Sequence, residues 1–123
     1  MNECEENHLG FITDVTIIGS TGKEKTVKAR VDTGAASCSI SVKLAAELEL
    51  GPVSKVKEIK SANGRKVRPF VKSKFRIKGK TITVYASLSD RKHMTYPVLI
   101  GRNALKKLGF LINPNKTQEK KEN

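Results

Sequence analysis

The chain has 123 residues, with 24 Lys+Arg against 12 Asp+Glu and a formal net charge of +12. This length accommodates one domain with one modest core, and the low aromatic content of 5%, with no Trp, requires that core to be mostly aliphatic. An acidic start, two cysteines (Cys4 and Cys38) and no apolar run of roughly 18 residues exclude a disulfide scaffold, a membrane protein and a large multidomain enzyme.

The first predicted elements are a β-hairpin and a short helix. Residues 9–18 and 26–31 are rich in β-branched side chains and flank the turn signal Gly-Ser-Thr-Gly at 19–22. Residues 42–48 then carry apolar side chains at helical spacing, and Gly51-Pro52 closes this helix.

The second half of the chain predicts further short strands. Residues 53–60 and 66–77 flank Asn63-Gly64, the dipeptide that most strongly favours a tight hairpin. From residue 81 apolar and polar side chains alternate strictly, which predicts a strand with one buried face. An apolar triplet at 98–100, one or two helical turns at 103–108 and a last strand at 110–112 follow. Together these elements predict an all-β barrel or sandwich with one or two short helices.

The positive charge is concentrated in one segment. Residues 52–80 hold eleven Lys and Arg side chains against Glu58 alone, a surplus of ten. Such a segment attracts polyanions, whether nucleic acid, an acidic peptide or an anionic surface. A solubilising polar strand face is the alternative interpretation.

Several common chemical motifs are missing. The sequence has no HExxH, no paired CxxC and no phosphate-binding GxxxxGK[ST] loop. Cys4 and His8 are close enough in sequence to contact a metal, but they belong to an acidic leader, and His93 stands alone in a polar loop. We therefore expect neither a metal nor a cofactor.

The sequence Asp32-Thr33-Gly34 is the best candidate for catalysis. It follows an apolar strand end directly, Gly34 permits a tight turn, and backbone N–H groups of that turn can hold the Asp32 carboxylate. The Thr33 hydroxyl can reach a neighbouring loop. By itself, an Asp in a turn after a strand is ordinary.

Three segments in order along the chain resemble the retropepsin-like aspartic protease family. Residues 31–35 (Val-Asp-Thr-Gly-Ala) resemble its catalytic loop, 61–64 (Ser-Ala-Asn-Gly) its flap hairpin, and 98–105 its second signature, with Gly-Arg after an apolar triplet. Residues 68–71 and 89–102 resemble the subfamily labelled ATP-dependent zinc protease. The resemblance implies a small closed acid-protease barrel at residues 9–114. The composition of the segments on either side predicts an acidic flexible leader at 1–8 and a polar disordered tail at 115–123.

The resemblance also assigns roles. It implies three groups of residues: catalytic Asp32, Thr33 and Gly34; substrate-binding flap residues Ala62, Asn63, Gly64 and Arg65; and supporting signature residues Gly101, Arg102 and Asn103. Aspartic proteases use two carboxylates that share one proton, and this chain has a single Asp-Thr-Gly. A homodimer must then supply Asp32 twice, because Asp14 and Asp90 lack the loop context.

The sequence departs from the retroviral pattern at one position. Retroviral relatives carry an acidic residue four positions after the catalytic Asp, where it pairs with the Arg of the Gly-Arg signature. Here that position is Ala36, so Arg102 needs another partner. This mechanism requires no thiol, so we expect Cys38 to be a buried structural residue.

The resulting expectation is a cytoplasmic aspartic endopeptidase, a hydrolase that acts as a homodimer on acidic, glutamate-rich peptide tails. The alternative is a non-catalytic basic β-barrel that binds nucleic acid or a protein partner. Nucleic acid is the second choice because single-strand binders stack bases on aromatic rings, and only Phe70 and Phe75 lie in the basic segment, on opposite strand faces. No membrane partner is expected.

Overall fold

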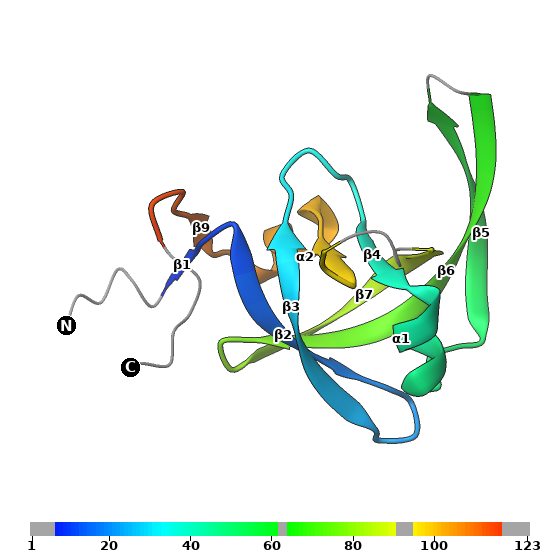
Figure 1. Ribbon diagram of the computed structural model, residues 1–123, viewed down its shortest axis with the longest axis horizontal. Helices are drawn as coiled ribbons and strands as arrows, with labels where there is room; N and C mark the ends of the chain where they lie inside the picture. Colours follow the sequence, from blue (N-terminus) through cyan, green and yellow to red (C-terminus); the bar gives the residue numbers. More distant parts are fainter. Residues whose placement is uncertain (1–6, 62–63, 91–94, 117–123) are drawn as a thin grey trace.

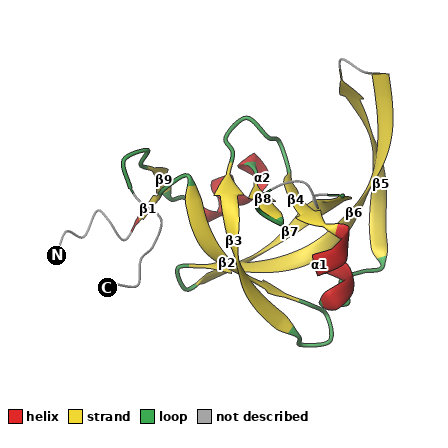
Figure 2. Cartoon of the chain, in the orientation of Figure 1, coloured by secondary structure: helices red, strands yellow, loops and turns green. Residues whose placement is uncertain are grey.

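Nine strands and two short helices form in residues 7–61, 64–90 and 95–116, the part of the chain that this computed structural model describes (Figures 1 and 2). The strands are β1 (His8–Leu9), β2 (Ile12–Ile18), β3 (Glu24–Val31), β4 (Cys38–Ser41), β5 (Val53–Ser61), β6 (Gly64–Ile77), β7 (Lys80–Ser89), β8 (Val98–Ile100) and β9 (Leu111–Ile112). The helices are α1 (Val42–Glu47) and α2 (Arg102–Leu108).

Pairing between β2 and β6 closes the main sheet on itself. The strand order is β2-β3-β8-β4-β7-β6-β5, and the additional β2–β6 pairing joins six of these strands into a closed barrel. β5 remains outside the ring, because it pairs with β6 where that strand projects from the barrel (Figure 1). The predicted all-β barrel with two short helices is confirmed, and a two-sheet sandwich is not formed.

Both predicted hairpins form. β2 pairs antiparallel with β3 from Ile12↔Arg30 to Ile18↔Glu24, and β5 pairs antiparallel with β6 up to Ser61↔Gly64. Gly64 has φ +110°, a backbone conformation that glycine adopts without a steric penalty.

The core is aliphatic, as the composition requires. Ile82, Val84 and Ala86 of β7 are buried, which confirms the predicted alternation. The alternation ends at Ser87, which is also buried, because the neighbouring strand β4 begins opposite Ala86 and the Ser87 hydroxyl donates to the Cys38 carbonyl at 3.4 Å.

α2 covers the part of β7 that β4 does not reach. Its Asn103 and Lys107 side chains donate to the carbonyls of Tyr85 and Thr83, at 2.9 and 2.6 Å. The same helix buries Ala104 and Leu108 in the core. These contacts satisfy backbone acceptors that no strand pairs, and they fix the start of α2 beside β4.

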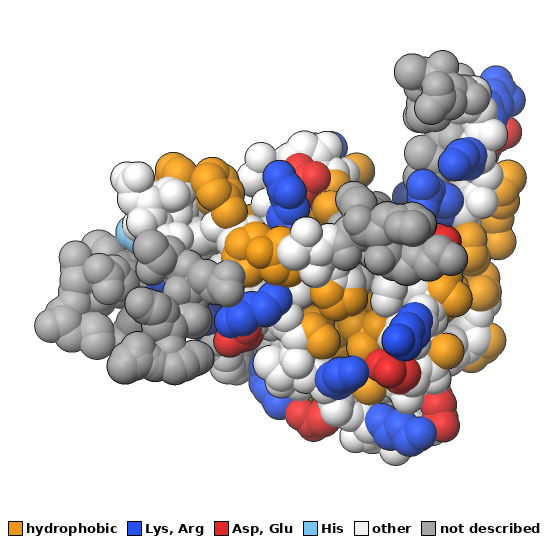
Figure 3. Space-filling model, viewed as in Figure 1, with side chains coloured by type: hydrophobic (Ala, Val, Ile, Leu, Met, Phe, Trp, Pro, Cys, Tyr) orange, Lys and Arg blue, Asp and Glu red, His pale blue; other side chains and the backbone are white. Residues whose placement is uncertain are grey.

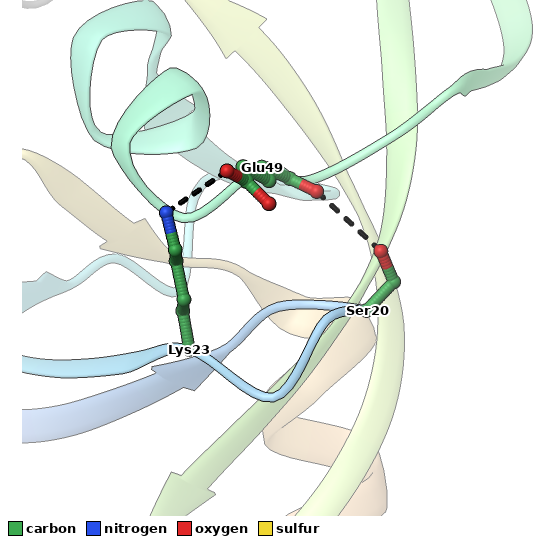
Figure 4. A network of polar contacts seen from close by, with 3 residues as sticks. All are labelled: Ser20, Lys23 and Glu49. Carbon is green, nitrogen blue, oxygen red and sulfur yellow. Dashed lines mark hydrogen bonds and ion pairs between the residues drawn. The ribbon is translucent and has the colours of Figure 1, made fainter.

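The β2–β3 turn packs against the end of α1. Lys23 and Glu49 form an ion pair of 2.9 Å and the Ser20 hydroxyl donates to the Glu49 carbonyl at 3.4 Å (Figure 4). A Cβ on Gly19 would lie 2.1 Å from the Leu48 carbonyl oxygen, so only glycine permits this approach. The ammonium group of Lys23 lowers the pKa of the Glu49 carboxyl.

The two ends of the described chain meet in a separate small sheet. β1 pairs parallel with β9, and the Asn113 N–H donates to the Leu9 carbonyl at 2.7 Å. β1 therefore begins at His8, inside the predicted leader, and Lys116 of the predicted tail donates to the His8 carbonyl at 3.3 Å. Residues 1–6, with Cys4, and residues 117–123 lie outside the described residues.

Candidate active site

The Asp32 carboxylate stands where β3 leaves the barrel. Val31, the last residue of β3, pairs parallel with Ile100 of β8 and donates its N–H to the Phe11 carbonyl at 2.7 Å. The Asp32 N–H donates to the Ile100 carbonyl at 2.9 Å. Backbone contacts on both sides thus fix the point at which the chain turns out of the sheet, with the Asp32 side chain half-buried.

The loop after β3 holds the carboxylate. The Gly34 N–H donates to Asp32 Oδ1 at 2.8 Å, and the Ala35 N–H donates to the Asp32 carbonyl at 3.2 Å. The first contact confirms the prediction that a backbone N–H of this turn holds the carboxylate. A Cβ on Gly34 would lie 3.2 Å from Oδ1, closer than ordinary van der Waals contact. Thr33 and Gly34 are exposed.

The Gly-Arg signature lies directly against this loop. A Cβ on Gly101 would lie 2.4 Å from the Ser37 carbonyl oxygen and 3.0 Å from that of Ala35. The N–H groups of Arg102 and Asn103 donate to the carbonyls of Ala35 and Ala36, at 2.8 and 3.1 Å. The structure therefore brings the predicted catalytic residues and the predicted signature residues together.

Two side chains of α2 complete these contacts. Arg102 Nη1 donates to the Thr33 carbonyl at 3.0 Å, so a backbone oxygen of the Asp-Thr-Gly loop is the partner that the sequence left open. Asn103 accepts from the Cys38 N–H at 3.0 Å and donates to the Tyr85 carbonyl at 2.9 Å. Asn103 thereby joins the end of the loop to β7.

Cys38 lies beneath the loop as a buried thiol, which confirms the structural role predicted for it. Its side chain is fully buried, and the Gly101 N–H donates to its Sγ at 3.4 Å. Burial raises the pKa of the Cys38 thiol to about 11, so it stays protonated and unreactive at neutral pH.

An open hollow of about 550 Å³ adjoins Asp32. It is lined by Phe11, Ile12, Arg30, Val31, Asp32, Thr33, Tyr96 and Ile112. Asp32 is the sole carboxylate among these lining residues. Sequence reasoning missed Phe11 and Tyr96, because they come from separate segments that only the closed barrel brings to Asp32.

Gly64 and Arg65, the two predicted flap residues that the structure describes, are not among the residues that line this hollow. Gly64 and Arg65 lie at the far end of the β5–β6 hairpin, which projects from the barrel (Figure 1), and Arg65 forms an ion pair with Glu58 at 3.4 Å. Ala62 and Asn63, the other two predicted flap residues, lie outside the described residues. His93 lies outside them as well.

Two searches of the described residues gave negative findings. No three His, Cys, Asp or Glu side chains come close enough together there to hold a metal ion. Neither helix of this part of the chain is long and apolar enough to cross a membrane.

The fold is shared with a bacterial protein and with retroviral proteases. A Legionella pneumophila protein of unknown function superposes with a TM-score of 0.63 at 22% identity, covering 90% of this chain and 95% of its own. The EIAV protease, solved with the inhibitor HBY-793, gives a TM-score of 0.63 at 20% identity, covering 80% of this chain and 88% of its own. The simian foamy virus protease gives a TM-score of 0.58 at 20% identity, covering 80% of this chain and 94% of its own.

A family profile extends this likeness from fold to sequence. The profile described as "RimB-like: Retropepsin-like aspartic endopeptidase RimB" matches residues 43–123, about two thirds of the chain. No curated protein matches, and the ATP-dependent zinc protease label finds no support. The matched residues run from α1 through the β5–β6 hairpin and the Gly-Arg signature, and they begin after the Asp-Thr-Gly loop. The chain belongs to the RimB-like family of retropepsin-like aspartic endopeptidases.

Proposed function

We propose that this protein is an aspartic peptidase in which Asp32 is the catalytic carboxylate and two subunits together form one active site. The observation that carries the proposal is the Asp32 carboxylate itself, which is held by its own loop beside an open hollow. No second carboxylate lines that hollow. Aspartic peptidase chemistry requires two carboxylates about 3 Å apart, so the second must come from another copy of the chain.

Apolar side chains beside the hollow support a subunit interface there. The Phe11 side chain, which lines the hollow, is 54% exposed, and Leu111 of β9 is 63% exposed. Exposed apolar side chains of this size, gathered at one place, are typical of a surface that another protein covers. A two-fold axis through this surface would bring the two Asp32 loops together and bury both residues.

In the proposed mechanism the paired Asp32 carboxylates share one proton. The ionised carboxylate takes a proton from a water molecule as the water oxygen attacks the peptide carbonyl carbon, and the protonated carboxyl donates its proton to the carbonyl oxygen. The carboxyl that took the water proton then donates it to the nitrogen as the C–N bond breaks, and the other carboxylate recovers a proton from a hydroxyl of the tetrahedral intermediate, so the pair again holds one proton. The Gly34 N–H orients Asp32 Oδ1 throughout, and Arg102 fixes the loop through the Thr33 carbonyl.

We further propose that the substrate is an acidic, glutamate-rich peptide segment. The net charge of +12 and the surplus of ten positive charges in residues 52–80 support this choice, because they attract a polyanionic chain. The attraction is screened over about 8 Å at physiological ionic strength. Cleavage of glutamate-rich peptides is therefore expected to slow with added salt, and neutral peptides are expected to be cleaved poorly at any salt concentration.

A subunit-mixing experiment tests the two-subunit site. The Asn amide cannot accept or donate the proton that the two carboxyl groups share, so Asp32→Asn should abolish cleavage of a glutamate-rich peptide. Its circular dichroism spectrum should match that of the wild type, which shows that the fold is retained. When the wild type is mixed with an equal amount of Asp32→Asn and the subunits exchange, about half of the wild-type activity should remain, because random pairing puts half of the wild-type subunits opposite a variant subunit. Equal activity before and after exchange would mean that one chain suffices.

Two further outcomes separate the remaining alternatives. If the wild type binds glutamate-rich peptides or nucleic acid without cleaving either, the protein is the non-catalytic binding module of the alternative hypothesis. Cleavage that is equally fast for acidic and neutral peptides, at low and high salt, leaves the peptidase proposal intact but contradicts the acidic substrate. The matched control is Asp14→Asn, which removes a carboxylate of β2 that pairs with Lys28 at 2.7 Å and should leave activity unchanged.

A further inference from the structure

The outer face of the β6–β7 pair carries lysines beside an exposed aromatic ring. Alternate residues of β6 are buried in this part of the strand, so Lys72 and Lys74 between them point away from the core and are exposed. The register places Lys72 beside Tyr85 of β7 and Lys74 beside Thr83. Because side chains of register partners lie on the same face of a sheet, these four residues share the outer face of the barrel.

Two further lysines reach β7 from neighbouring elements. Lys107 of α2 donates to the Thr83 carbonyl at 2.6 Å, and Lys55 Nζ lies 4.2 Å from the centre of the Tyr85 ring. Each contact restricts a flexible side chain without neutralising its charge. We refer to the four lysines and the aromatic ring together as the basic surface, which consists of Lys55, Lys72, Lys74, Tyr85 and Lys107.

The positive charge of the basic surface is not compensated by acidic side chains. Ion pairs within the described part of the chain use five other cations, namely Lys23, Lys25, Lys28, Arg65 and Arg76. Arg76 follows on the same face of β6, but it pairs with Glu24 at 2.8 Å. Figure 3 shows such a mixed arrangement over α1 and the β2–β3 turn, where Lys and Arg side chains lie next to Asp and Glu side chains. The basic surface therefore favours a polyanionic partner.

The backbone beneath the basic surface offers no strand edge to a partner. β6 and β7 pair with each other, β6 also pairs with β2, and β7 meets β4 and the side chains of Asn103 and Lys107 on its other side. A partner must therefore be recognised through the lysine charges and the Tyr85 ring, which is 38% exposed. A glutamate-rich peptide matches only the charges. A nucleic acid matches both, because its phosphates meet the lysines and an unstacked base lies against the ring.

We propose that the basic surface binds single-stranded nucleic acid without sequence preference. Phosphates would contact Lys72 and Lys74, which lie about 7 Å apart on one strand, and a base would stack on the exposed part of the Tyr85 ring. A duplex fits less well, because its bases are stacked on one another and leave the ring unused. None of the residues of the basic surface lines the hollow beside Asp32, so this binding does not depend on the peptidase chemistry.

The test measures fluorescence anisotropy of labelled oligouridine and oligothymidine of about twelve nucleotides, over a salt range of about 50 to 200 mM. Lys72→Gln with Lys74→Gln removes two phosphate contacts, so Kd at the lowest salt should rise at least about tenfold. The slope of log K against log salt should become shallower by about 1.4, since each phosphate contributes about 0.7 on a single strand. The matched control, Lys25→Gln with Lys43→Gln, removes two exposed charges on β3 and α1. It should raise Kd less than about threefold and leave the slope unchanged.

Substitutions of Tyr85 separate nucleic acid from an acidic peptide. Tyr85→Ala should weaken oligonucleotide binding about fivefold or more, whereas Tyr85→Phe retains the stacking ring and should bind as the parent does. A glutamate peptide with the same number of charges, measured in the Asp32→Asn protein so that it stays intact, should bind more weakly than the oligonucleotide and should not respond to Tyr85→Ala. A duplex should not respond to Tyr85→Ala either, because it presents no unstacked base.

Amide NMR shifts locate the binding site. Addition of oligouridine should shift the amide signals of residues 72–74 and 83–85, and shifts confined to residues of the hollow would contradict the proposal. No oligonucleotide binding at low salt, equal effects of the two pairs of lysine substitutions, or a glutamate peptide or duplex that binds more tightly than the single strands would overturn it.

Discussion

The substitution Gly101→Ala directly perturbs the contact between the Gly-Arg signature and the Asp-Thr-Gly loop. Gly101 has φ −100° and ψ −176°, an extended conformation that any residue adopts, so the cost of a side chain here is one of space. The added Cβ would lie 2.4 Å from the Ser37 carbonyl oxygen and 3.0 Å from that of Ala35. Both atoms belong to backbone, which cannot turn aside as the end of a flexible side chain can.

The size of the effect follows from this geometry. Ordinary contact with a Cβ begins at 3.4 Å, so the loop must retreat by about 1 Å from Gly101. That shift acts on the hydrogen bonds from Arg102 to Ala35 and from Asn103 to Ala36, at 2.8 and 3.1 Å. Overpacking of this kind lowers the free energy of unfolding by about 1–3 kcal/mol. A displacement of about 1 Å at a catalytic group lowers the rate by roughly 100-fold.

The assay compares unfolding and activity in two variants. Gly19→Ala is the matched control, because its Cβ would lie 2.1 Å from the Leu48 carbonyl oxygen, at the other end of the barrel strands. Urea unfolding should show a stability loss in both variants. At a temperature where both remain folded, kcat/KM on a glutamate-rich peptide should fall only for Gly101→Ala. Wild-type kcat/KM in folded Gly101→Ala would refute the reasoning that this contact positions Asp32.

Three further predictions concern the support beneath the loop. Burial raises the pKa of the Cys38 thiol to about 11 from an ordinary value of 9.0, so as the pH rises this thiol ionises in the unfolded chain before it ionises in the folded one. The stability that the neutral thiol contributes is therefore present below pH 9 and is lost as the pH rises to 11. Urea unfolding of wild type against Cys38→Ala should show this difference shrinking by about 2–3 kcal/mol across that range. Asn103→Leu leaves the part-buried Cys38 N–H without an acceptor and should cost about 1–3 kcal/mol in thermal or urea unfolding. The Tyr85 carbonyl is in an exposed contact and can bind water instead. Asn103→Asp retains the acceptor and should cost less. Arg102→Gln removes the 3.0 Å hydrogen bond to the Thr33 carbonyl and should lower kcat more than it raises KM. A change in KM alone would contradict a role of Arg102 in positioning the loop.

The sequence predicted most of the fold because its signals are local. Asn63-Gly64 and the β-branched segments on each side of residues 19–22 indicate hairpins from neighbours within a few positions. β4 (Cys38–Ser41) and β1 (His8–Leu9) were not predicted, because neither contains the apolar run that marks the equally short β8 and β9. They form through pairing with distant segments, β4 with β7 and β8, and β1 with β9.

The candidate site was predictable only in part, because a sequence shows local motifs but not the contacts between distant segments. Asp32, Gly101 and Arg102 stand in recognisable motifs, and the structure brings them into contact. The Thr33 carbonyl as the partner of Arg102 depends on backbone geometry, which a residue pattern does not record. Phe11 and Tyr96 carry no motif that links them to Asp32, although both line its hollow.

The pairing of β1 with β9 has a consequence for biosynthesis. These strands lie near opposite ends of the chain, yet Phe11 just after β1 and Ile112 of β9 both line the hollow beside Asp32. Closing so long a loop is entropically costly and is expected late in folding. On the ribosome, the hollow therefore lacks the part of its wall that Ile112 supplies until residues 111 and 112 have emerged. The barrel can form earlier, but the walls of the hollow are complete only after Ile112 has left the ribosome, which delays any assembly through this surface until that point.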